Sequence, residues 1–188
     1  CIRDSVYAES DTGENEPIWV DSFTQPITSN GVDIFWIIDG SGSMMNDNGK
    51  VLQGISDMLA NLPPISCRLM IISMTPTENI NSTSFPLIPG DDEVDAVAMF
   101  SANVNQGSEF GFSSLHDYIQ ENQFAQNWLR DDAALLTVFV SDEDDQSTTY
   151  FHSVNSFANW LDSIRNNVFV SSIVHLPPDE TDCITNDR

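Results

Sequence analysis

Positive charge is almost absent from this sequence. Its 188 residues include 6 Lys and Arg against 29 Asp and Glu, for a formal net charge of -23, and Lys50 is the only lysine. Nucleic acid is excluded as a partner, because binding its phosphates needs a cationic surface that this chain cannot assemble. Two interpretations of the acidity stay open. It solvates the surface in a salty medium, where ions screen repulsion beyond about 10 Å, or it takes part directly in cation binding.

Cysteine, histidine motifs and long apolar runs are also scarce. The three cysteines, Cys1, Cys67 and Cys183, are too few for a disulfide framework and lack the spacing of zinc or redox motifs. No histidine belongs to a metal-binding motif and no nucleophile–base pair is visible, so nothing predicts an enzyme. No stretch reaches the roughly 18 consecutive apolar residues of a membrane span, so we expect no transmembrane segment. A chain that begins at Cys1 is compatible with a processed bacterial lipoprotein.

The remaining composition predicts one folded domain with polar flanks. With 40% of its residues hydrophobic, a chain of this length can bury a core of its own. Residues 1–30 are polar and acidic, and we expect them to form an N-terminal arm that packs on the domain through Trp19, Val20 and Phe23. Residues 31–176 form the predicted domain. Residues 177–188 are an acidic tail or the start of further sequence.

Hydrophobic patterns predict the elements of that domain. Four short apolar runs predict strands buried on both faces, at residues 32–38, 67–74, 133–140 and 168–174. Helical spacing of apolar residues predicts helices at residues 51–62, 92–102, 112–123, 124–129 and 154–164. Residues 75–95 carry no helix pattern and are expected to form a surface excursion with a short strand at 84–88. The alternation predicts an α/β fold, with an open, mostly parallel, doubly wound sheet and helices on both faces.

Oxygen-bearing side chains follow two of the predicted strands. Asp39, Ser41 and Ser43 come directly after the first strand, separated by glycines that let the backbone fold tightly. Asp142 ends the strand that is expected to lie alongside. Because ligands bind beyond the carboxyl ends of the strands in an open α/β sheet, these side chains are expected to converge. Mg²⁺ and Ca²⁺ choose oxygen ligands of this kind, so the cluster predicts a metal with an open position.

Plainer interpretations exist for these residues. Ser43 is also placed to cap the helix that follows it. Asp144 and Asp145, which continue the acidic run after Asp142, are expected to be solvated or to accept hydrogen bonds near the site instead of binding the metal. Glu109 has two possible roles: a bond to neighbouring backbone, or contact with the metal.

The segment from Val32 to Ser43 resembles the first strand and the metal-ion-dependent adhesion site (MIDAS) of von Willebrand factor A-type (VWA) domains, with bacterial surface VWA proteins among them. That family carries Asp-x-Ser-x-Ser after a hydrophobic strand, a threonine in a second loop and an aspartate in a third, where Asp142 fits. The threonine is missing here, and Ser108 or Glu109 stands in its place. We expect Ser108 to lie nearer the metal and Glu109 to face the rim.

The resemblance implies a Rossmann-like VWA domain over residues 31–176 that acts as a non-enzymatic binding module. Mg²⁺ or Ca²⁺, with Mn²⁺ also possible, would coordinate an acidic or hydroxyl group of a protein or glycan partner, as in cell adhesion by secreted and surface proteins. Its ligands would be Asp39, Ser41, Ser43, Asp142 and Ser108 or Glu109.

Two other functions stay open. One is a structural subunit of an extracellular filament or a virion, with the fold as scaffold. The other is a metal-dependent hydrolase that activates water at the same cluster. We expect the protein to be extracellular or on a surface. The family's sixth strand and final helix have no counterpart after Val174.

Overall fold

The computed structural model describes residues 31–61, 66–104 and 107–174, which contain a four-stranded sheet with strand order β2-β1-β3-β4. The strands are β1 (Val32–Ile38), β2 (Cys67–Ser73), β3 (Ala134–Ser141) and β4 (Val168–Val174). Every neighbouring pair is parallel. The predicted α/β class is therefore confirmed. The arm at 1–30, with its expected anchors, and the tail at 177–188 lie outside the described residues.

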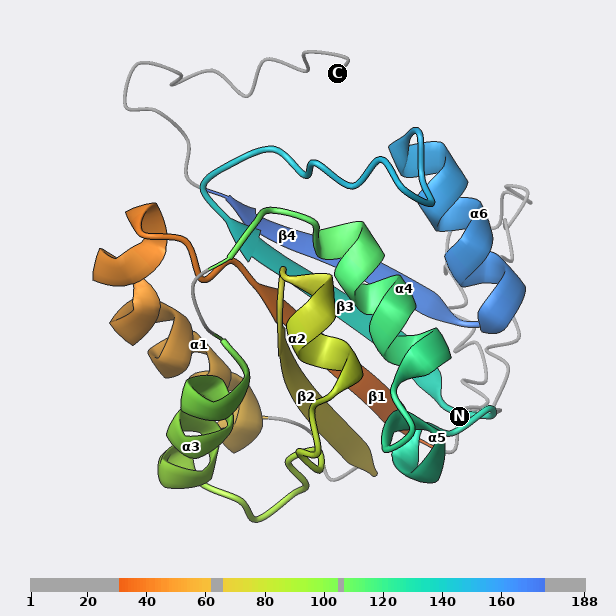
Figure 1. The fold of residues 1–188 in the computed structure, drawn as a ribbon. Coiled ribbons are helices and arrows are strands. Elements are labelled where there is room, and N and C mark those ends of the chain that lie inside the picture. The colour runs from red at the N-terminus through yellow and green to blue at the C-terminus, as the bar shows by residue number, and fades with distance from the viewer. Residues whose placement is uncertain (1–30, 62–65, 105–106, 175–188) are drawn as a thin grey trace, which may run out of the picture.

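Helices cover the two faces of the sheet. They are the 3-10 helix η1 (Ser43–Asn46) and the α-helices α1 (Asn48–Asn61), α2 (Pro76–Ile80), α3 (Glu93–Asn103), α4 (Gly111–Glu121), α5 (Ala125–Trp128) and α6 (Val154–Ile164). The indole of Trp36 in β1 lies against Met58 of α1. The ring of Phe35 lies against Tyr118 of α4. Because neighbouring residues of a strand face opposite sides, α1 and α4 cover opposite faces. α3 packs against α1, and α2 against α4 (Figure 1).

β1 is the centre of the core. Ile34, Phe35, Ile37 and Ile38 are at most 1% exposed, because β2 and β3 flank the strand and helices cover both its faces. This burial explains why its sequence is continuously apolar instead of alternating. Asp39 directly follows β1, so it lies between the neighbouring strands at the end of the sheet where the strands terminate.

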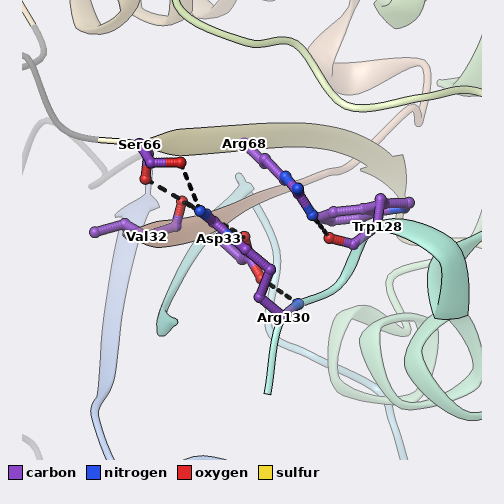
Figure 2. A network of polar contacts seen from close by, with 6 residues as sticks. All are labelled: Val32, Asp33, Ser66, Arg68, Trp128 and Arg130. Atoms are coloured by element: carbon purple, nitrogen blue, oxygen red, sulfur yellow. Dashed lines mark hydrogen bonds and ion pairs between the residues drawn. The ribbon is translucent and has the colours of Figure 1, made fainter. Parts of the chain in front are cut away.

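A buried ion pair links the strands at the opposite end of the sheet, where they begin. Arg130, just before β3, donates from its backbone N–H to Asp33 Oδ2 at 2.9 Å and from Nη2 to Asp33 Oδ1 at 2.6 Å. Its Nη1 reaches Ser66 Oγ at 2.7 Å, and its Nη2 reaches the carbonyl of Val32 at 3.0 Å. Figure 2 shows this network together with the bond from Arg68 to the carbonyl of Trp128. Asp33 is fully buried, so Arg130 fixes the starts of β1, β2 and β3 relative to one another.

Three predicted features were wrong. Residues 76–80 form the short helix α2, which apolar periodicity cannot reveal because its buried residue is polar: Asn79 pairs with both backbone groups of Ser73. The strand expected at 84–88 is only an isolated antiparallel bridge from Leu87 to Leu69. β4 is apolar as predicted but is not buried, because it forms the edge of the described sheet.

None of the described helices has both the length and the apolar character needed to cross a bilayer.

Candidate metal centre

Loop 1, residues 39–43, folds back on the carboxylate at its start. Asp39 is fully buried, and its backbone N–H donates to the carbonyl of Val140 at 2.9 Å, which continues the β1–β3 pairing. The N–H of Ser41 donates to Asp39 Oδ1 at 2.7 Å. The hydroxyls of Ser41 and Ser43 lie 2.8 Å apart. The loop therefore gathers one carboxylate and two hydroxyls, as its spacing predicted.

The interpretation of Ser43 as a helix cap is wrong. Ser43 is the first residue of η1, whose N-cap is Gly42, and no side chain caps that helix. Its hydroxyl instead donates to Asp142 Oδ1 at 3.1 Å, across 99 residues of sequence. Ser43 thus joins loop 1 to the loop after β3.

Loop 3, residues 141–147, follows β3 and completes this connection. Ser141 Oγ donates to Asp39 Oδ2 at 2.8 Å and accepts from the N–H of Glu143 at 3.0 Å. Both carboxylate oxygens of Asp39 are therefore held, by Ser41 from its own loop and by Ser141 from the neighbouring strand. Sequence reasoning missed Ser141, although it directly precedes Asp142 in the motif.

Loop 2, residues 107–110, is hydrogen-bonded to the two residues that follow β2 and to loop 3. The N–H of Ser108 donates to Thr75 Oγ1 at 3.2 Å, and the N–H of Phe110 donates to the carbonyl of Met74 at 3.1 Å. Glu109 accepts twice from Gln146: at its carbonyl from the backbone N–H at 2.7 Å, and at Oε2 from the side-chain amide at 3.0 Å. The Glu109 carboxylate thus contacts loop 3. Thr75 was not singled out in the sequence, because it lies between β2 and α2, outside any recognised motif.

Asp145 accepts hydrogen bonds, one of the two roles expected for it. Its Oδ2 accepts from the N–H of Phe112 at 3.0 Å, and its Oδ1 accepts from the N–H of Ser147 at 2.9 Å. The first of these bonds satisfies an N–H in the first turn of α4, a helix whose own N-cap residue, Phe110, has no side-chain acceptor. The N–H of Ser113 in turn donates to Ser147 Oγ at 3.0 Å. These bonds hold loop 3 against the start of α4.

The acidic side chains of these loops lie close enough to repel one another. The pKa of the exposed Glu143 carboxyl is raised chiefly by the negative charge of Glu109, and further by Asp142 and Asp39. These four carboxyl groups come from all three loops. A cation placed among them would relieve this repulsion, which is the electrostatic condition for a metal site.

The donor set fits a hard divalent cation. Asp39, Ser41, Ser43 and Asp142 provide two carboxylates and two hydroxyls, which are ligands of the kind that Mg²⁺ and Ca²⁺ prefer. Within the described ranges, no group of three or more His, Cys, Asp or Glu side chains is placed to hold a metal ion. Half of the candidate ligands are serine hydroxyls, which do not belong to these four residue types.

No family model matches the chain, and no curated protein matches it. Solved structures similar to it include a von Willebrand factor type A protein from Catenulispora acidiphila, with 17% identity, a TM-score of 0.47 and coverage of 78% of this chain and 33% of that one. The pilus adhesin SpaC from Lactobacillus rhamnosus GG has 18% identity and a TM-score of 0.41, over 64% and 15% of the two chains. Proximal thread matrix protein 1 from the mussel byssus has 15% identity and a TM-score of 0.48, over 78% and 38%.

These solved structures include a VWA protein, the family that the sequence resembles. This chain spans less than two fifths of the length of each of them. With TM-scores below 0.5, the likeness says nothing about ligands or partners. The assignment to the α/β class rests on the strand order and the helices of the chain itself.

Proposed function

We propose that this protein is a binding module that holds a divalent cation at the carboxyl edge of its sheet and presents it to an oxygen-bearing group of a partner. Asp39, Ser41, Ser43 and Asp142 would hold the ion, which would act as a Lewis acid toward a carboxylate or hydroxyl of a protein or glycan. The site would bind and not catalyse. The protein would work outside the cell or on a surface, as expected for an adhesion module.

The observation that carries this proposal is the bonded link between loops 1 and 3. The hydroxyl of Ser43 donates to Asp142, and the hydroxyl of Ser41 lies within hydrogen-bond distance of Ser43. Residues 99 positions apart in sequence thus bring their oxygens to one point. Since strand ends impose no such contact by themselves, the arrangement supports a common ligand.

The spacing of these oxygens agrees with Mg²⁺. Neighbouring ligands in an octahedron with bonds of 2.0–2.1 Å lie about 2.9 Å apart. The Ser41–Ser43 and Ser43–Asp142 separations are 2.8 and 3.1 Å. O–H···O hydrogen bonds have similar lengths. Ca²⁺ accepts larger and looser sets of oxygens, so the ratio of the Mg²⁺ and Ca²⁺ affinities tests whether the spacing suits Mg²⁺.

Metal titration of the intact chain by calorimetry, at a constant ionic strength of about 0.15 M, tests the site. Asp39→Ala is expected to abolish binding, and Asp142→Asn to weaken it at least tenfold, since a lost charge-assisted contact costs about 1.5–3 kcal/mol. Asp162→Asn is the matched control, because it removes the same charge from an exposed position on α6. Equal affinity of Asp142→Asn and the wild type would place the site elsewhere, and an equal loss in Asp162→Asn would indicate diffuse counterion binding.

Loop 2 offers two candidates for a further metal ligand, Ser108 and Glu109. The carboxylate of Glu109 is engaged with Gln146, and a direct contact would raise the charge of the ligands, with Asp39 and Asp142, to -3. That charge overcompensates a divalent ion and reduces its attraction for an acidic partner. We therefore expect Ser108→Ala to weaken metal binding more than Glu109→Gln does, by on the order of 1–3 kcal/mol for a lost ligand. The reverse ranking in the titration would assign the position to Glu109.

Partner binding and turnover separate the other functions. An adhesion module loses its partner when the metal is chelated, whereas a scaffold subunit keeps its contacts. Hydrolysis of an ester or peptide by the metal-loaded chain, abolished by Asp39→Ala, would assign it to the hydrolases instead.

A further inference from the structure

A polar hollow of about 360 Å³ lies between α2, the loop that follows α2 and the end of α3. All but one of its lining residues are polar: they are Glu78, Asn81, Ser82, Thr83, Ser84, Ala102 and Asn103. None of them belongs to loops 1, 2 or 3 of the candidate metal centre. Asn81 and Thr83 are exposed at its rim. The volume is at the lower end of the roughly 300–1,000 Å³ of ligand pockets, so the hollow suits a small group.

Asn103 determines how the two serine hydroxyls of this hollow are oriented. It is buried, and its Nδ2 donates to the carbonyl of Ile71 at 2.8 Å, which fixes the orientation of the amide. Its Oδ1 therefore accepts, from Ser82 Oγ at 3.0 Å and from Ser84 Oγ at 3.0 Å. Each hydroxyl has one hydrogen, and both hydrogens are used in these bonds. Toward a ligand, the hydroxyls of Ser82 and Ser84 can only accept.

Glu78 adds a carboxylate to the same wall. The residue is half-buried, and its Oε2 is withdrawn from solvent without a hydrogen-bond partner among the described residues. A desolvated carboxylate oxygen that lacks a donor is unfavourable, and a ligand that donates to it would remove this cost. Because the terminal torsion of a glutamate side chain is broad, either oxygen can turn toward the hollow.

The positive side chains in the described part of the chain are bonded elsewhere. Lys50 pairs with Asp47, Arg68 with the carbonyl of Trp128, Arg130 with Asp33, and Arg165 with the carbonyl of Ile164. None of these four side chains is bonded to Glu78. The net charge of -23 adds a general attraction for a positively charged partner.

We propose that this hollow binds the guanidinium group of an arginine side chain from a partner protein. A guanidinium has five N–H donors and no acceptor, which complements the carboxylate of Glu78 and the hydroxyls of Ser82 and Ser84. Its planar fork pairs with a carboxylate through two parallel hydrogen bonds and keeps further N–H groups for the hydroxyls. It is also more weakly hydrated than the ammonium of lysine, so it enters a half-buried site at lower cost. The site is independent of the metal centre.

A nuclear magnetic resonance titration of the intact, ¹⁵N-labelled chain tests the proposal, at an ionic strength of about 0.15 M and without divalent ions. The probe is N-acetyl-arginine amide. We expect the amide signals of residues 78–84 and 102–103 to shift and to saturate. N-acetyl-citrulline amide has nearly the same shape but no charge, and it should bind about tenfold more weakly or less tightly still. N-acetyl-lysine amide should bind severalfold more weakly than the arginine amide.

Three variants locate the binding. Glu78→Gln keeps the size of the side chain, removes its charge and should weaken binding about tenfold. Glu93→Gln is the matched control, because it makes the same change at an exposed position at the start of α3, and it should leave the affinity unchanged. Ala102→Trp narrows the hollow from an exposed position without altering an acceptor, and it should abolish saturation. Unchanged signals of β1 and β3 show an intact fold in each variant.

Four results would overturn the proposal. Equal affinities for the arginine and citrulline amides would exclude a charged ligand, and a lysine amide that binds as tightly as arginine would exclude selection of the guanidinium. Equal losses in Glu78→Gln and Glu93→Gln would assign binding to the diffuse negative charge of the chain. In Asp39→Ala, which removes a candidate ligand of the metal centre, the arginine titration should be unchanged. Ca²⁺ that shifts the amides of residues 78–84 in that variant and displaces the arginine amide would make the hollow a metal site instead.

Discussion

Removing the Arg130 side chain should destabilise the domain strongly, because it leaves a charge buried without its partner. In Arg130→Met, the fully buried Asp33 loses its bonds from Nε and Nη2 and keeps the backbone N–H of residue 130. The bonds to Ser66 Oγ and the Val32 carbonyl are lost as well. Breaking a buried ion pair from one side costs about 3–5 kcal/mol. Single domains are stable by about 5–15 kcal/mol, so this variant loses a large fraction of the total.

Urea denaturation followed by tryptophan fluorescence measures this loss. With a slope of about 2 kcal/mol per M, the midpoint should fall by roughly 1.5–2.5 M. The double variant Asp33→Leu/Arg130→Met removes both charges and should recover most of the loss, because apolar residues of similar volume replace buried ion pairs at little cost. Asp131→Asn, at a fully exposed carboxylate 3.7 Å from Arg165, should leave the midpoint unchanged. An Arg130→Met midpoint equal to that of Asp131→Asn would refute the reasoning, and so would a double variant no more stable than the single one.

Two further predictions concern the loops of the site. Gly107→Ala places a methyl group into Thr75 Oγ1, the acceptor of the Ser108 N–H, so it should displace loop 2 and weaken metal binding severalfold, whereas Gly42→Ala, which meets nothing within 4 Å, should not. Calorimetry of both variants decides this. Asp145→Ala removes the acceptor at the start of α4 and should lower the free energy of unfolding by about 1 kcal/mol in urea denaturation, with metal affinity changed less than twofold. A tenfold loss of affinity would make Asp145 a ligand.

Much of the fold was predictable from the sequence because burial on both faces leaves a simple signal. The continuous apolar run of β1 and its glycine-spaced loop marked both the central strand and the position of Asp39. Loops 1 and 3 were expected to lie close together because parallel strands end on the same side of a sheet. The hydrogen bond from Ser43 to Asp142 connects these two loops.

Other features lie beyond such patterns. Helix α2 depends on Asn79, a buried amide whose partners are backbone groups of β2, and hydrophobic periodicity carries no information about them. The role of Ser141 depends on its distance to Asp39 across 102 residues. The exposure of β4 could not be predicted either, because an apolar run has the same composition whether or not a neighbour covers it.

Metal binding and the Arg130 network should stabilise the domain independently. Asp33 and Asp39 lie six residues apart along β1 and just beyond it, about 20 Å at 3.3 Å per residue. Effects at sites more than about 7–10 Å apart usually add to within about 0.5 kcal/mol. Mg²⁺ at 100 times its dissociation constant should therefore raise the free energy of unfolding by about 2.7 kcal/mol in both the wild type and Arg130→Met. The measurement is a pair of urea titrations with and without the ion for each protein, with Asp142→Asn as the chain that should gain least. Increments that differ by much more than 0.5 kcal/mol would mean that the network at the starts of the strands also sets the geometry of the loops at their ends.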